Sequence, residues 1–154
     1  MRIMLLLLAL IVLVSGCSSL GSGGRQVSEN TGPIEFLGAK LKEDIKLNQM
    51  GRVIEINLTD KAVTDEDLKV IAQYKHLQML KLARTSVTDA GLSNLRPLQN
   101  LRAIWLARTG VSDAGLAHLA ELKSLREVRL YPNRVTDSAV DELKAKLPGI
   151  RVIY

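Results

Sequence analysis

The sequence predicts an α/β solenoid in which a short strand and a short helix recur along the chain. Four segments of this 154-residue chain share one pattern and begin 24 residues apart, at Val53, Leu77, Leu101 and Leu125. A fixed period of this length is typical of stacked repeats that share a continuous core. Hydrophobic residues make up 47% of the chain but aromatic residues only 3%, so we expect an aliphatic core.

Each repeat opens with a predicted strand. Apolar residues occupy its first, fourth and sixth places, and polar residues alternate with the last two, which is the period of a strand. Because strand side chains alternate between faces, the third, fifth and seventh places should point away from the core. The apolar residues are Leu77, Leu80, Leu82, Leu101, Ile104, Leu106, Leu125, Val128 and Leu130.

A predicted helix follows each strand. Its start is marked by a Ser or Thr, which is a preferred N-cap, and by an Asp, which suits the positive end of the helix dipole. Pro97 should shorten the second helix and favour a 3₁₀ turn there. The pairs are Thr64-Asp65, Thr88-Asp89, Ser112-Asp113 and Thr136-Asp137.

Both ends of the repeat array carry their own signals. Residues 33–52 are predicted to form an N-terminal cap, in which turn residues 48–51 join two strands into a β-hairpin that covers the first edge of the sheet. Residues 53–154 form the repeat domain, with about four repeats and a short final strand at residues 150–154. Arg151 in that strand should discourage further strand addition.

The pattern L-x-x-L-x-L-x-x-(N/T)-x-V over residues 53–149 resembles the leucine-rich repeat, and Val-Thr-Asp-Ala-Gly-Leu at residues 87–92 is similar to bacterial internalin-like repeats. The resemblance implies a short right-handed solenoid with parallel strands on the concave face and helices on the convex face, and it carries over no catalytic residue. The family's ninth-place Asn is present only as Asn133. Thr85 and Thr109 should bond the loop backbone less fully than Asn, and Lys61 should make the first repeat irregular.

The N-terminus has the features of a secretory signal in residues 1–16. Arg2 precedes twelve apolar residues, fewer than the ~20 that span a bilayer core. Val14-Ser15-Gly16-Cys17 resembles the lipobox of bacterial lipoproteins, which implies cleavage before Cys17 and lipid on that cysteine. An ordinary cleaved signal with a chance cysteine and an uncleaved anchor remain as alternatives.

Residues 17–32 are predicted to be the lipidated cysteine and a flexible tether. The segment after Cys17 is small and polar, and fifteen such residues span about 20 Å on average. We therefore expect a lipid-anchored protein of the cell envelope, on the outer membrane facing the periplasm or at the cell surface. A single cysteine also excludes an intramolecular disulfide.

The face predicted to be displayed carries basic and aromatic residues. Trp105 stands at the fifth place and should be exposed between Lys81 and Arg129 of the neighbouring strands, about 4.8 Å away on each side. One interpretation is a binding site, since aromatic and Arg residues dominate binding hot spots. The other is that the two cations merely cover the ring. The predicted binding residues are Lys81, Arg84, Trp105, Arg108, Arg129 and Tyr131.

Other function classes receive little support. The net charge of +5 is dispersed, and no basic run, zinc spacing or aromatic RNA-binding motif is present, so we expect no nucleic acid, metal or cofactor. The recurring Asp of the helix starts could suggest calcium, but capping accounts for it. Glu55 and Glu127 could partly neutralise the displayed face, and at about 14 Å apart they are too distant for paired carboxylate chemistry.

The function predicted from the sequence is a lipid-anchored envelope protein, not an enzyme, whose leucine-rich repeat surface binds a protein partner with an acidic surface. Two alternatives remain open. One is an enzyme or enzyme accessory subunit that acts on an envelope polymer. The other is a structural envelope protein without a dedicated ligand. The oligomeric state is left open.

Overall fold

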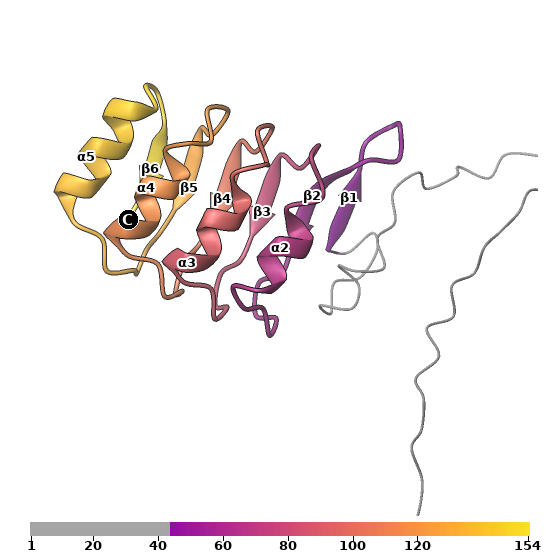
Figure 1. Cartoon of the computed structure of the whole chain (residues 1–154), viewed down its shortest axis with the longest axis horizontal. Coiled ribbons are helices and arrows are strands. Elements are labelled where there is room, and N and C mark those ends of the chain that lie inside the picture. Colours follow the sequence, from indigo (N-terminus) through magenta and orange to yellow (C-terminus); the bar gives the residue numbers. More distant parts are fainter. Residues whose placement is uncertain (1–43) are drawn as a thin grey trace, which may run out of the picture.

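The computed structural model describes residues 44–154, which contain one six-stranded sheet (Figure 1). The strands follow each other across the sheet in chain order, and every pair is parallel except the first, which is antiparallel. The register advances by 24 residues per strand, as from Leu80 to Ile104. The strands are β1 (Ile45–Leu47), β2 (Val53–Asn57), β3 (Met79–Lys81), β4 (Ala103–Trp105), β5 (Glu127–Arg129) and β6 (Arg151–Ile153).

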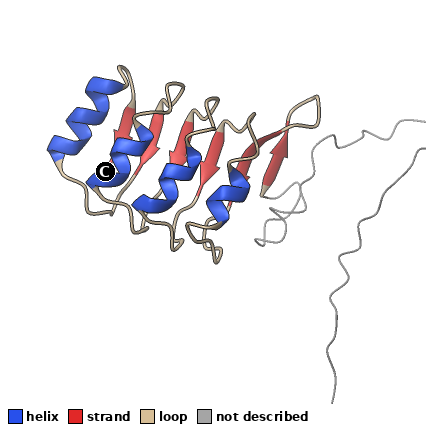
Figure 2. Ribbon diagram, in the orientation of Figure 1, coloured by secondary structure: helices blue, strands red, loops and turns tan. Residues whose placement is uncertain are grey.

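The helices cover one face of this sheet, and the other face, which we call the open face, carries none of the described helices (Figure 2). The predicted fold class is confirmed: this is a short leucine-rich repeat solenoid with an N-terminal β-hairpin. The second helix is short and passes into a 3₁₀ turn before Pro97, as expected. The helical elements are α2 (Asp67–Ile71), α3 (Asp89–Leu92), η1 (Ser93–Leu95), α4 (Asp113–Leu119) and α5 (Asp137–Lys146).

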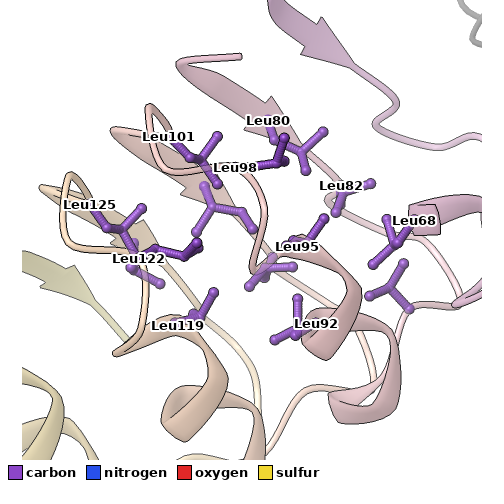
Figure 3. Packing of buried hydrophobic residues seen from close by; sticks show 14 of the residues in the cluster. Leu68, Leu80, Leu82, Leu92, Leu95, Leu98, Leu101, Leu119, Leu122 and Leu125 are labelled. Atoms are coloured by element: carbon purple, nitrogen blue, oxygen red, sulfur yellow. The ribbon is translucent and has the colours of Figure 1, made fainter. Parts of the chain in front are cut away.

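The core lies between the sheet and the helices and is continuous from repeat to repeat (Figure 3). Side chains at the fourth and sixth strand places are fully buried, as at Ile104 and Leu106. Leu92, Leu95 and Leu119 meet them from the helical side. Each such side chain contributes about 1.5–3 kcal/mol of hydrophobic free energy, so neighbouring repeats stabilise one another.

The ninth-place residues close the loops after the strands. Thr85 and Thr109 each donate from Oγ1 to the carbonyl three residues earlier, at 2.7 Å, within their own loop. Asn133 does more, because its Nδ2 donates to the Leu106 carbonyl at 2.8 Å and its Oδ1 accepts from the Thr109 N–H at 3.1 Å. Asn133 thus ties the fourth repeat to the third, which confirms that Thr serves the loop less fully than Asn.

The first repeat is irregular, as predicted. Its helix α2 begins at Asp67 and not at Thr64 and Asp65, where the pattern placed the start. Lys61 replaces the loop-closing Thr or Asn, and its Nζ lies 3.6 Å from an Asp44 carboxylate oxygen.

The signal at residues 1–16, Cys17, the tether to residue 32 and the cap up to residue 43 all lie outside the described residues. Within residues 44–154, the helices are too short and too polar for one of them to cross a membrane.

Candidate binding surface

Trp105 is the centre of a stacked cluster on the open face. Lys81 Nζ from β3 lies 4.5 Å from the ring centroid, and Arg129 Cζ from β5 lies 4.3 Å from it. The prediction that these two cations flank Trp105 is confirmed. The prediction that Trp105 is exposed is wrong: the residue is half-buried, and the charged ends of Lys81 and Arg129 lie over its ring. Its Nε1 is buried and has no hydrogen-bond partner among the described residues.

Carboxylates on the same face hold the two stacked cations. Glu55 accepts from Lys81 Nζ at 2.7 Å, and its other oxygen accepts from Lys46 Nζ at 2.8 Å. Glu127 accepts from Arg129 Nε at 2.7 Å. The expected partial neutralisation of this face therefore takes the form of specific ion pairs, and Lys81 and Arg129 are already engaged inside the molecule.

The eighth place of the repeats forms a row at the end of the strands. Asp60, Arg84 and Arg108 occupy it in three successive repeats, all in the left-handed backbone region with φ of 62°, 58° and 56°. Such angles are uncommon in residues other than glycine. The Asp60 N–H donates to the Ala83 carbonyl at 3.0 Å, and the Arg84 N–H to the Ala107 carbonyl at 2.9 Å. The loops of neighbouring repeats are therefore held side by side.

Arg84 is paired with Asp60 across these loops. Its Nε and Nη2 donate to the two carboxylate oxygens of Asp60, which is the two-pronged arrangement of an arginine–carboxylate pair. This hydrogen bonding and the opposite charge raise the pKa of Arg84 and lower that of Asp60. Asp60 was missed by the sequence reasoning, although its position 24 residues before Arg84 was the available signal.

Among the predicted binding residues, Arg108 and Tyr131 are exposed and their side chains make no ion pair or hydrogen bond within the described part of the chain. Tyr131 has a relative exposure of 68%, and Arg108 is also exposed. Neither side chain forms an ion pair or hydrogen bond with another residue of the described part. The Arg108 N–H likewise has no described acceptor, whereas Asp60 and Arg84 each donate to the next loop.

The recurring Asp residues lie in the first turn of α3, α4 and α5, as predicted, but the carboxylates of Asp65, Asp89 and Asp113 also link successive repeats. Asp89 accepts from the Ser112 N–H at 2.8 Å and from its hydroxyl at 2.6 Å. Asp65 and Asp113 receive the same two bonds from Thr88 and Thr136. The hydroxyls of Thr88 and Ser112 therefore donate to the preceding repeat and do not cap their own helices, whereas that of Thr136 does both.

The described residues provide neither the ligand cluster that a metal site requires nor a pocket for a small ligand. They contain no group of three or more His, Cys, Asp or Glu side chains placed to hold a metal ion. A cavity of about 30 Å³ lies on the helical side, lined by residues of α4 and α5 that include Leu116, Ala120 and Leu143. That volume suits a water molecule and no larger ligand.

No protein-family model and no curated protein sequence matches the chain. Among solved structures, 37 chains match. An internalin (inlF) from Listeria monocytogenes shares 17% identity with a TM-score of 0.40 and covers 56% of this chain. The PEPR1–AtPEP1 structure shares 17% identity with a TM-score of 0.44 and covers 72% of it. The present chain spans only 30% and 19% of those two proteins.

Proposed function

We propose that this chain is a protein-binding module held at the cell envelope by lipid on Cys17, and that its partner binds at the loop edge of the open face. We call this the arginine edge, and it comprises Arg84, Arg108 and Tyr131. The observation that carries the proposal is that the Arg108 and Tyr131 side chains are exposed and have no ion-pair or hydrogen-bond partner among the described residues.

The chemistry of these side chains suits protein recognition. Arg and Tyr are enriched among the residues that contribute most to binding, because each joins a large contact area to hydrogen-bonding capacity. We do not place Trp105 in direct contact with the partner, because Lys81 and Arg129 cover its ring. The proposed contact area therefore moves from the centre of the strands to their loop edge.

The proposed anchor rests on the N-terminal sequence. A lipobox-like Val14-Ser15-Gly16-Cys17 would place acyl chains at the start of the mature protein, and two or more such chains hold a protein stably on a bilayer. The polar residues that follow would let the repeat domain stand away from the membrane.

Site-specific photo-cross-linking tests the binding surface. A photoreactive residue at position 131 should yield a cross-linked product of defined mass in intact envelopes, while the same residue at position 117 should not. Ala117 is the matched control because it is exposed on α4, on the helical side. No product at position 131, or the same products at both positions, would favour a structural envelope protein without a dedicated ligand.

Labelling with a radioactive fatty acid tests the anchor. The wild-type chain should incorporate the label and sediment with membranes, whereas Cys17→Ser should do neither, because Cys17 is the only thiol in the chain. Unchanged sedimentation of the unlabelled Cys17→Ser chain would point instead to an uncleaved anchor.

A further inference from the structure

We propose that Arg108 binds a carboxylate of an acidic polypeptide partner, in the way that Arg84 binds the carboxylate of Asp60. This inference rests on the proposed function and specifies the chemistry of the partner.

The molecule already contains one such arginine–carboxylate pair. Asp60 and Arg84 stand one repeat apart at the same place, and both have left-handed backbones. Their side chains meet through two hydrogen bonds, although each is more than half exposed, at 56% and 53%. The eighth place thus presents an arginine in a geometry that receives a carboxylate on the side of the preceding repeat.

Arg108 has the same left-handed backbone as Arg84 but has no Asp at the eighth place of the preceding repeat. Its φ of 56° matches the 58° of Arg84, so the two side chains leave the backbone in similar directions. The eighth place of the preceding repeat holds Arg84 itself, a second cation that is already bound to Asp60. Within residues 44–154 the Arg108 guanidinium therefore has no carboxylate partner.

The loops on both sides of Arg108 also carry arginine residues. Arg84 lies in the loop before it, and the exposed Arg134 lies in the loop after it, which Asn133 ties to Thr109 at 3.1 Å. The carboxylates of Glu55 and Glu127 on the open face do not pair with Arg108, since they bind Lys81 and Arg129. Because Asp60 already pairs with Arg84, the uncompensated positive charge that an added carboxylate meets here comes from Arg108 and Arg134.

Two groups beside the Arg108 guanidinium favour a polypeptide as the source of the carboxylate. Tyr131 stands at the seventh place of the following repeat and offers an exposed ring against which a partner side chain can pack. The Arg108 N–H, which has no acceptor among the described residues, can donate a hydrogen bond to a partner's main-chain carbonyl. An extended acidic segment supplies all three: a carboxylate, a side chain to pack and a carbonyl.

Peptide binding to the full chain in detergent micelles tests the proposal. The probe is a fluorescent ten-residue peptide of alternating glutamate and serine, and the comparison peptide carries glutamine for glutamate. Arg108→Glu should weaken binding of the acidic probe at least tenfold. Arg102→Glu, the same charge change at the opposite end of β4, should weaken it less than threefold, because Arg102 is exposed but outside the arginine edge.

Two further measurements test whether the Arg108 site prefers a carboxylate and needs a guanidinium. Arg108→Lys keeps the charge but loses the two-pronged geometry, so its affinity should fall between those of wild type and Arg108→Glu. Acetate should displace the acidic peptide at lower concentration than glycerol phosphate does at equal ionic strength. The reverse order would assign the site to a phosphate such as a lipid headgroup and overturn the proposal.

The outcomes separate this inference from the proposed function. Equal weakening by Arg108→Glu and Arg102→Glu, or equal binding of the two peptides, would reject the carboxylate site. Cross-linking at position 131 that survives Arg108→Glu would reject it too while leaving the binding function in place. Thermal unfolding of each variant should match that of wild type, since Arg108 is exposed and unpaired in the described structure.

Discussion

At the scale of single residues, Glu55 on the open face binds two lysines, Lys46 and Lys81, one with each carboxylate oxygen. Burial, the largest single influence, raises the pKa of Glu55, but hydrogen bonds and charge from Lys46 and Lys81 outweigh it and lower the pKa below its ordinary value. One oxygen of Glu55 holds Lys81, and Lys81 in turn covers one side of Trp105. Protonation of Glu55 should therefore loosen the stack.

The lowered pKa of Glu55 predicts a loss of stability in acid. A carboxyl group whose pKa is depressed by folding stabilises the protein fully above its unfolded-state pKa, and that contribution disappears as the pH falls through the folded-state value. We expect wild type to exceed Glu55→Gln in free energy of unfolding at pH 7, and the gap to close below the ordinary glutamate pKa of about 4.3. Urea denaturation across this range measures it, and a gap that stays constant with pH would contradict the assignment.

At the scale of the elements, neighbouring repeats are joined by Asp65, Asp89 and Asp113, which we call the Asp ladder and which accept hydrogen bonds from the Thr or Ser of the next repeat. Gly91 and Gly115 leave room for these carboxylates, since an added Cβ would collide with Asp65 and Asp89, respectively. Asp137 is engaged in a similar way, since the Tyr154 hydroxyl donates to it at 2.8 Å. The Thr/Ser-Asp pair thus sets how adjacent units stack.

Asp89→Asn should therefore destabilise the fold. Ser112 donates two hydrogen bonds to this carboxylate, and bonds to an ionised group are stronger than neutral ones. We expect a loss of about 1–2 kcal/mol in urea denaturation. Asp141→Asn is the matched control, because Asp141 pairs only with Lys144 on the surface at 3.6 Å, and it should cost about 0.5 kcal/mol or less. Equal losses would count against the ladder.

At the scale of the whole molecule, one aliphatic core joins the hairpin to the last strand. The cluster extends from Ile45 on β1 to Ile150 beside β6 without a break between repeats. Since every repeat contributes to its neighbour's core, the described domain should unfold as one unit.

Leu106→Ala tests this continuity. Leu106 is fully buried between the sheet and the helices, so the truncation should cost about 2–5 kcal/mol and shift the whole transition. Far-UV circular dichroism and the fluorescence of Trp105, the one tryptophan of the chain, should report the same lowered midpoint. Tyr131→Ala, at 68% exposure, should change the free energy by about 0.5 kcal/mol or less. Two separate transitions would show that the repeats unfold independently.

Local signals in the sequence were sufficient for the architecture. The 24-residue period, the alternation within the strands, the hairpin and the break at Pro97 all appear in the structure, because each depends on backbone preferences or on which face must be buried. The first helix was misplaced, because the described residues offer Thr64 no Asp of a preceding repeat; its N–H and hydroxyl donate instead to Asp67, where the helix begins.

The candidate surface was likewise predictable from the sequence only in part. The sequence alone determined which residues face away from the core, because strand alternation and the repeat assign every side chain to a face. Only the tertiary structure decided which of them are free. Lys81, Arg129 and Arg84 find carboxylates on adjacent strands or loops, and Trp105 is covered, whereas Arg108 and Tyr131 are not. Pairing depends on side-chain reach between neighbouring repeats, which the periodic pattern of a single repeat does not contain.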